Sequence, residues 1–257
     1  MDLTLQAFLI VLPAVFLAGL VDSIAGGGGL LSVPAYLAAG LPPHFALGNN
    51  KFSSCFGTLF ATLRYHQHGL IDGRVAVLSA LFALAGSHLG TRAVLLLRPS
   101  FLRWLLIVLL PLVAAFTLAH RGLGRENRSH RHAPGKKVLL ASLAALAIGF
   151  YDGFFGPGTG TFLILFYTLA LHYDFVTANA NTKVVNLASN IAAMATFIAH
   201  GKVLFALGVP AAAAGIAGNL LGARLVIRRG GALIRPVFLF TLLLLFAKVL
   251  FDLLAAG

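Results

Sequence analysis

Charged residues are scarce in this sequence, and acidic residues are the scarcest of them. Only 10% of the 257 residues are charged, with 7 Asp and Glu against 19 Lys and Arg, whereas 59% are hydrophobic. Soluble domains average about 25% charged and about 45–50% apolar residues. The shortage of charge excludes a soluble globular protein, because so apolar a surface cannot face water. With a mean hydropathy of +0.94, the chain is predicted to be a polytopic membrane protein.

Cysteine and several catalytic signatures are also missing. The single cysteine, Cys55, excludes an internal disulfide and a zinc site ligated by cysteines. The GxxxxGK[ST] pattern of nucleotide-binding loops is absent, so ATP-driven transport by this chain alone is not expected. No His-Glu-x-x-His zinc motif occurs, and the serines of the apolar segments lack His and Asp partners at a matching depth. We therefore expect no enzyme activity, no cofactor and no metal site.

Six of the 19 basic residues lie in one short stretch of the chain. Arg121–Lys137 carries six Lys and Arg residues between two apolar segments. Because there is no separate basic domain and no basic patch interleaved with aromatic residues, nucleic acid is not an expected partner. Cations mark the cytoplasmic side of a membrane protein, so this stretch is predicted to be a solvated cytoplasmic linker.

The two halves of the sequence repeat each other at an offset of 130 to 132 residues. Gly19–Gly28 matches Gly149–Gly158 with the aspartates and glycines in step, and Ala46–Lys51 matches Ala178–Lys183. Each half contains about four apolar segments. The predicted organisation is a first transmembrane repeat over residues 1–119, a basic cytoplasmic linker over 120–136 and a second transmembrane repeat over 137–257.

The first apolar segment of each half is too long for a single crossing. Leu3–Ala39 as one helix would run for about 55 Å, against about 30 Å of hydrocarbon. The four glycines at 26–29, and the glycine-rich stretch Gly156–Gly160, supply flexible backbone for a reversal. Each half is therefore predicted to begin with a broken helix, which turns back near the midplane of the membrane through a short second helix of about 15 Å.

These hairpins predict the topology of the whole chain. A hairpin returns the chain to its starting side, so each half makes an odd number of net crossings and the second repeat is inverted. With the linker in the cytoplasm, this arrangement places twelve Lys and Arg residues on the cytoplasmic side and four outside. This agrees with the rule that cytoplasmic loops of membrane proteins are rich in Lys and Arg. Both termini then face the extracytoplasmic side. The expected fold is an all-α polytopic membrane protein with two inverted-topology repeats.

Four ionisable residues stand in otherwise apolar segments: Asp22, Lys51, Asp152 and Lys183. Each costs about 2.5–3.5 kcal/mol near the bilayer centre, so residues in such places usually serve a function. One alternative is a pair of structural bridges, Asp22 with Lys51 and Asp152 with Lys183; another is that the lysines extend to the membrane interface. Their recurrence at matching positions favours function, with the two aspartates as candidates for proton coupling.

Helices that begin inside a membrane attract anions, because a helix N-terminus carries about half a positive charge. The short helices after the two glycine breaks provide two such N-termini, and asparagine amides and lysines stand close to them in the repeat pattern. Together they predict a small-anion site near the midplane of the membrane. The predicted substrate-binding residues are Gly27, Gly28, Gly29, Asn49, Asn50, Lys51, Gly158, Thr159, Gly160, Asn181, Lys183 and Asn186.

Several motifs recur in both halves, namely the Asp-x-x-x-Gly blocks and the Gly-x-x-x-Gly-x-Arg endings, together with the related Gly-Asn-Asn-Lys and Asn-Thr-Lys-Val-Val-Asn stretches. Over about residues 8–250 they resemble the TauE/SafE sulfite exporter family, in its branch of uncharacterised bacterial inner-membrane permeases. The resemblance implies a secondary transporter in the inner membrane, an exporter of anions such as sulfite, sulfonates or other organosulfur acids, working by alternating access. A passive anion channel with the same site stays an alternative. A homo-oligomer stays open.

Overall fold

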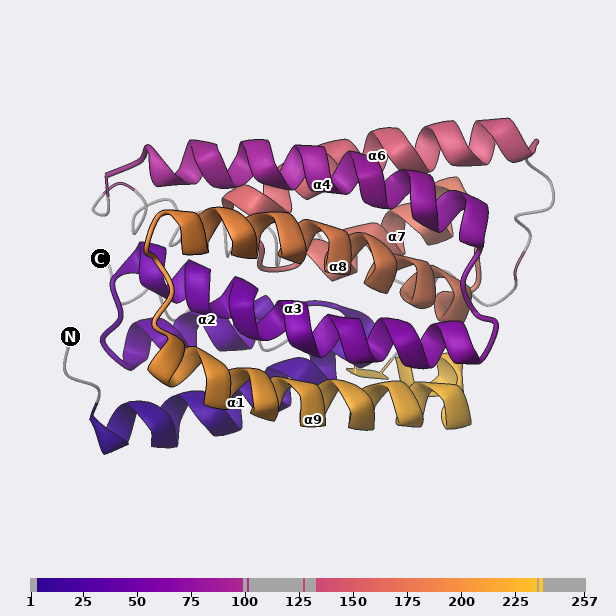
Figure 1. Ribbon diagram of the computed structural model, residues 1–257. Coiled ribbons are helices and arrows are strands. Elements are labelled where there is room, and N and C mark those ends of the chain that lie inside the picture. Colours follow the sequence, from indigo (N-terminus) through magenta and orange to yellow (C-terminus); the bar gives the residue numbers. More distant parts are fainter. Residues whose placement is uncertain (1–3, 99–100, 102–126, 128–132, 235, 238–257) are drawn as a thin grey trace, which may run out of the picture.

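The computed structural model describes residues 4–98, 101, 127, 133–234 and 236–237. Within these residues there is no strand, and the chain forms helices joined by short turns (Figure 1). The helices are α1 (Leu5–Ala25), α2 (Gly29–Ala38), α3 (Pro43–Gln67), α4 (Gly73–Leu95), α6 (Pro134–Phe154), α7 (Thr159–Ala170), α8 (Phe175–Ala199) and α9 (Phe205–Arg229).

Five of the described helices are long and apolar enough to cross a membrane, namely α1, α4, α6, α8 and α9. Two further apolar helices are short, α2 with 10 residues and α7 with 12. α3 is long as well, but it carries the asparagines and the lysine of the first repeat. The all-α polytopic membrane fold expected from composition is confirmed.

Both long first helices lead into a short helix that turns back. At 1.5 Å per residue, α2 and α7 are about 15 and 18 Å long. In Figure 1, α1 and α3 begin at the same end of the molecule, so the hairpin of α1 and α2 has returned the chain to that end. α6 and α8 begin together at the opposite end. The broken helices predicted at the glycine-rich stretches are confirmed.

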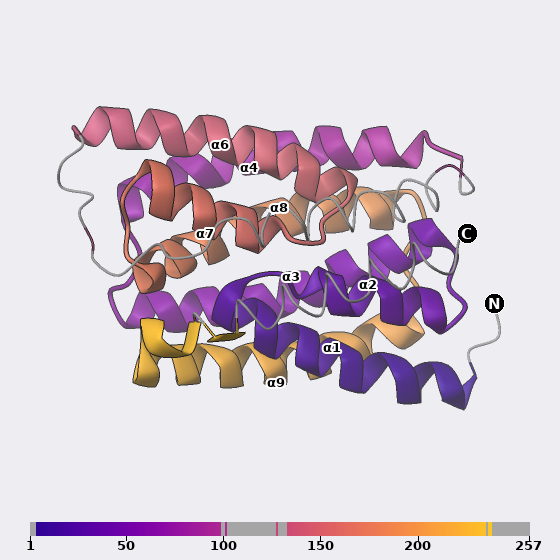
Figure 2. The same cartoon turned by 180° about the vertical axis from the view of Figure 1, so that it is seen from behind.

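The two halves pack mainly against each other. α4 lies beside α6 at one edge of the molecule and α1 lies beside α9 at the other, with α3 and α8 between these edges (Figures 1 and 2). Exchanging α1 for α6, α3 for α8 and α4 for α9 reproduces the same pairs of neighbouring helices. Residues near the middle of α3 and α8 therefore lie where the halves meet.

Glycines make the packing at the two edges close. A Cβ atom on Gly90 of α4 would lie 2.0 Å from the backbone oxygen of Phe150 in α6. A Cβ atom on Gly218 of α9 would lie equally close, at 2.0 Å, to the backbone oxygen of Phe16 in α1. Each glycine belongs to a Gly-x-x-x-Gly pair, which lets membrane helices approach through their backbones.

The relation of the repeats to the membrane stays a prediction. In Figure 1, α1 starts at the end near the N-terminus and α6 runs in the opposite direction. α6 begins at Pro134, so the last residues of the expected linker are helical, as suits proline in the first turn. Most of the linker 120–136, and most of the fourth apolar segment of each half (about 101–119 and 233–255), lie outside the described residues.

Candidate functional site

The two glycine breaks touch each other where the halves meet. In the first break, Gly26 and Gly27 have φ angles of 72° and 93°; in the second, Gly156 and Gly158 have 91° and 86°. Residues with a side chain rarely adopt such left-handed angles. A Cβ atom on Gly26 would lie 2.5 Å from the carbonyl carbon of Gly160. These glycines are therefore required both for the reversals and for the contact between the halves.

The four charged residues of the apolar helices form two ion pairs, and each pair joins the two halves. Lys51 Nζ in α3 lies 2.7 Å from Asp152 Oδ1 in α6, and Lys183 Nζ in α8 lies 2.9 Å from Asp22 Oδ2 in α1. The bridges within each half that stood as an alternative are wrong. Because the breaks cross, the second break itself lies against the first half's lysine, with Lys51 Nζ 3.2 Å from where a Cβ on Gly156 would be. Both lysine side chains are buried, so they do not extend to the interface.

The two aspartates have different surroundings. The Asp152 carboxylate accepts a hydrogen bond from the Ser189 hydroxyl in addition to its ion pair. The Asp22 carboxylate accepts a long bond from the backbone N–H of Gly28, at 3.4 Å, and Lys183 also donates to the backbone oxygen of Asp22. The Asp22 side chain is 18% exposed and the Asp152 side chain 6%. Asp22 is therefore the more accessible carboxylate.

A small cavity lies between the glycine breaks and the ion pairs. Water-sized spheres have about 30 Å³ of room in it, which corresponds to about two water molecules. It is lined by glycines of both breaks, by both aspartates and by asparagine side chains of α3 and α8. The predicted site residues in its lining are Asp22, Gly27, Gly28, Gly29, Asn50, Lys51, Asp152, Gly158, Thr159, Gly160 and Asn186.

Three further residues line this central cavity, although the sequence did not single them out: Ser54, Gly156 and Asn190. Asn190 lies seven residues after Lys183, and Ser54 lies three after Lys51, so each is on the lysine's face of its helix. Asn190 accepts a bond of 3.2 Å from the Lys51 ammonium. The helical period was the signal that could have found both residues.

Two predicted asparagines lie outside the lining of the central cavity. Asn49 donates to the backbone oxygen of Phe45, at 2.8 Å, one turn earlier in α3. The Asn181 side-chain oxygen accepts a bond of 3.1 Å from the backbone N–H of Asp72. The Asn49 side chain thus bonds within its own helix, and the Asn181 side chain joins α8 to the turn before α4. Lys183 acts on the cavity through its ion pair with Asp22.

Asp72, which precedes α4, holds one end of the helical bundle together. Its carboxylate accepts a bond of 2.7 Å from the Tyr173 hydroxyl and lies 3.4 Å from Lys137 Nζ. Partial burial acts to raise the pKa of the Asp72 carboxyl, but bonds from Tyr173, the Val75 amide and Lys137 outweigh burial and lower the pKa. The carboxylate thus stays ionised at neutral pH and links the turn before α4 to the starts of α6 and α8.

The chain matches the family model described as "Sulfite exporter TauE/SafE" over residues 11–249. This chain belongs to the TauE/SafE family. It is 34% identical to the "Probable membrane transporter protein" of Haemophilus influenzae over 252 residues, which cover 98% of each chain. It is 36% identical to the "Probable membrane transporter protein YfcA" of Escherichia coli K12 over 236 residues, 92% of this chain and 87% of that one. No solved structure gives a significant match.

As a TauE/SafE protein, the chain is a membrane transporter and not an enzyme. Its bacterial relatives and its apolar helices make it a multi-pass protein of the bacterial inner membrane. In this TauE/SafE transporter, the central cavity between the halves is the candidate substrate site.

Proposed function

We propose that this transporter moves small anions, such as sulfite, sulfonates or other organosulfur acids, through its central cavity, and that it exports them. The supporting observation is the convergence of cationic and donor groups on one buried space. The N-termini of α2 and α7, the Lys51 ammonium and the amides of Asn50, Asn186 and Asn190 all lie there. Helix N-termini that point into a membrane protein favour anions. The family's description as sulfite exporters supports the sulfur chemistry and the direction.

An anion in the cavity competes with the aspartates for the lysines. The two ion pairs bring two positive and two negative charges to the site, so its net charge is zero. When an anion takes Lys51 or Lys183, the aspartate left behind is a buried charge without a partner, which is strongly unfavourable. A cation at that aspartate removes the cost. Proton uptake by Asp152 or Asp22 therefore couples anion movement to protons in this proposal.

Alternating access follows from the size of the cavity. Room for about two water molecules is too little for an anion of four or more heavy atoms, so the helices around the cavity must separate before an anion enters. Most of the helix packing is between the two halves. Rocking of one half against the other then opens the cavity to one side of the membrane at a time.

Transport in proteoliposomes tests the proposed substrates. We expect sulfite, sulfoacetate, sulfolactate or thiosulfate to be exchanged by the purified protein, and simple carboxylates to be exchanged much more slowly, as measured with labelled anions. Empty liposomes are the control. Equal rates for carboxylates and sulfur anions would contradict the substrate class, and no movement of any of them would contradict anion transport.

Counterflow separates a transporter from the alternative of a passive channel. Liposomes loaded with unlabelled anion should transiently accumulate the labelled anion against its gradient, because a carrier returns loaded on each cycle. A channel shows no such accumulation. The small size of the central cavity favours the carrier, since a channel of the same residues would need a continuous water-filled path.

Reporter fusions test the inverted topology. A reporter that is active in the cytoplasm should be active after Gly124, within the linker, and inactive after Gly257, because the repeats make an odd number of crossings each. A periplasmic reporter should give the reverse pattern. If both positions report the same side, the two repeats are not inverted.

A further inference from the structure

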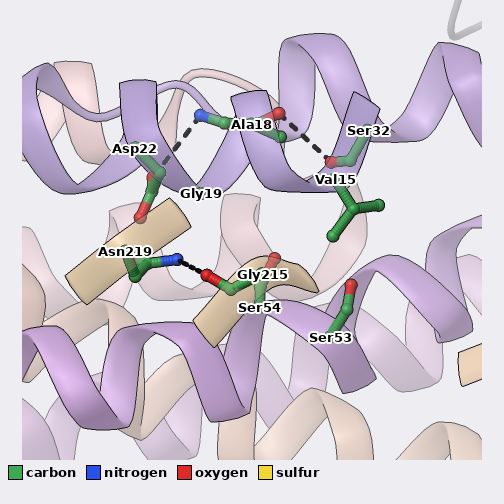
Figure 3. Close-up of a pocket in the computed structure, with 10 residues that line it drawn as sticks. Val15, Ala18, Gly19, Asp22, Ser32, Ser53, Ser54, Gly215 and Asn219 are labelled. Carbon is green, nitrogen blue, oxygen red and sulfur yellow. Dashed lines mark hydrogen bonds between the residues drawn. The ribbon is translucent and has the colours of Figure 1, made fainter. Parts of the chain in front are cut away.

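A second small cavity lies next to the central cavity, between α1, α2, α3 and α9 (Figure 3). It has about 20 Å³ of room, enough for a single water-sized particle. Asp22, Gly28 and Ser54 line both cavities, so the two share a wall. Unlike the central cavity, this second cavity has no lysine in its lining.

Asn219 of α9 lines this second cavity, and its side-chain oxygen has no hydrogen-bond partner among the described residues. The residue is 3% exposed, and its amide nitrogen donates to the backbone oxygen of Gly215 at 3.0 Å. Because the Gly215 oxygen can only accept, the nitrogen must face it. Glycines make room for this arrangement: a Cβ on Gly57 would lie 2.4 Å from Asn219 Nδ2, and one on Gly19 would lie 2.8 Å away.

Two serine hydroxyls in the lining of the second cavity already donate their hydrogen bonds to other acceptors. Ser32 Oγ donates to Asn50 Oδ1 at 2.5 Å, and Ser53 Oγ donates to the backbone oxygen of Asn49 at 3.0 Å. What these hydroxyls have left for the cavity is oxygen lone pairs. Figure 3 shows the Ser32, Ser53, Asp22 and Asn219 side chains gathered around the space. The Ser53 oxygen also accepts a bond of 3.1 Å from the Tyr36 hydroxyl, and the Gly28 N–H in the same lining donates to Asp22. The oxygens of Asp22, Asn219 and the serines are the groups of this lining that can bind a cation.

We propose that this second cavity binds one Na⁺ ion, held by the Asp22 carboxylate, Asn219 Oδ1 and the serine hydroxyls. Calcium sites need several carboxylates, and magnesium gives up its water reluctantly. A single carboxylate with neutral oxygens in a space for one water-sized particle suits a small monovalent cation. The cavity also lies at the C-terminal end of α1, where the helix carries partial negative charge.

Two of the serine hydroxyls have no polar counterpart in the second half of the chain. At the repeat offset, Ser32 is replaced by Phe162 and Ser53 by Val185. The Asp152 carboxylate is already covered by the donor hydroxyl of Ser189. The Na⁺ site is therefore proposed only beside Asp22, where α1, α2 and α3 of the first half meet α9 of the second, and Asp152 remains the carboxylate proposed for proton coupling.

The Na⁺ site gives Asp22 a second cation to bind. Lys183 holds Asp22 in the present conformation, and an anion that draws Lys183 away leaves the carboxylate to Na⁺. Anion and Na⁺ then bind on the two sides of one wall and favour each other. This coupling role rests on the proposed anion transport, whereas binding of the ion does not.

Direct binding of ²²Na⁺ to the purified full-length protein in lipid nanodiscs tests the site. We expect saturable binding that an equal concentration of K⁺ does not displace and that sulfite strengthens. Asn219→Ala and Ser54→Ala should each weaken Na⁺ binding by about tenfold, the loss expected when one ligand to a charge is removed. Asn190→Ala is the matched control, because Asn190 lines only the central cavity, and its Na⁺ affinity should stay within about twofold of wild type.

A stability measurement covers the case in which a variant folds poorly. Lys183→Met removes the cation that competes for Asp22, so Na⁺ should raise its melting temperature more than choline or K⁺ at equal ionic strength. Absence of saturable ²²Na⁺ binding in wild type, or unchanged affinity in both Asn219→Ala and Ser54→Ala, overturns the site. If Na⁺ binds as expected but no anion is transported, the ion site stands and the proposed function fails.

Discussion

Replacing Lys51 by methionine is expected to destabilise the transporter strongly, and Asp152→Asn in the same molecule is expected to restore much of the loss. The single change leaves the Asp152 carboxylate buried without its counter-charge, which costs about 3–5 kcal/mol. Removing both charges avoids that cost, since the pair was buried at the expense of its hydration. Thermal unfolding of the purified variants in detergent, followed by size-exclusion chromatography, measures the effect.

A mismatched double variant is the control for this experiment. Lys51→Met combined with Asp22→Asn also removes one positive and one negative charge. It leaves Asp152 and Lys183 each without a partner. Its loss of stability should therefore approach the sum of the two single losses. Equal rescue by Asp22→Asn and Asp152→Asn would contradict the pairing between halves.

Anion transport by the rescued variant separates a binding role from a structural one. If Lys51 holds the anion, the Lys51→Met/Asp152→Asn protein folds but exchanges sulfite at least about a hundredfold more slowly, because a charged hydrogen bond of about 3 kcal/mol is lost. If the pair is only structural, the rescued protein transports normally. Normal exchange at normal protein levels would remove Lys51 from the anion site.

Replacing Gly26 by valine is expected to abolish transport and to lower the amount of folded protein. Its Cβ would lie 2.5 Å from the carbonyl carbon of Gly160, and backbone in that place cannot yield as a flexible side chain does. The φ angle of 72° adds strain for any residue with a Cβ, and most for a β-branched one. The two breaks would be forced apart, and the N-termini of α2 and α7 would no longer meet at the cavity. Exchange rates at matched amounts of folded protein measure this.

Gly40→Val is the control, because it also places a side chain at a positive φ angle but without the contact. Gly40 has a φ of 86°, and nothing lies within 4 Å of a Cβ built there. Its cost should be limited to about 1–2 kcal/mol of stability, with transport retained. If Gly26→Val transports as well as Gly40→Val, contact between the breaks is not needed for function.

The glycine breaks show how far local pattern could predict the site. The sequence placed both reversals within two residues, because glycine runs between apolar segments leave little choice of where a helix ends. The structural role of each individual glycine was not predictable from the sequence. Gly28 is helical, with φ of −54°, and it is needed because a Cβ there would lie 2.5 Å from the backbone oxygen of Ala18 in the neighbouring helix.

The asparagines show that the repeated motif alone did not predict which residues line the central cavity. Asn49 and Asn50 are neighbours in the sequence, yet only Asn50 lines the central cavity, because adjacent residues point about 100° apart on a helix. Asn190 lines it from a position outside the repeated motif. Membership of a motif was thus a poorer guide than the face of the helix.

By itself, the sequence determined the membrane class, the two repeats, the broken helices and the identity of the four charged residues that form the ion pairs. These follow from composition, spacing and local backbone preference, which act over a few turns of helix. Only the tertiary structure decided that Lys51 bonds Asp152 and Lys183 bonds Asp22. Each half carries one aspartate and one lysine, so ion pairs within a half and ion pairs between the halves are both electrically neutral. Charge alone therefore does not distinguish the two pairings. The contact between the two glycine breaks decides the pairing, because it brings the end of each broken helix against the lysine of the other half.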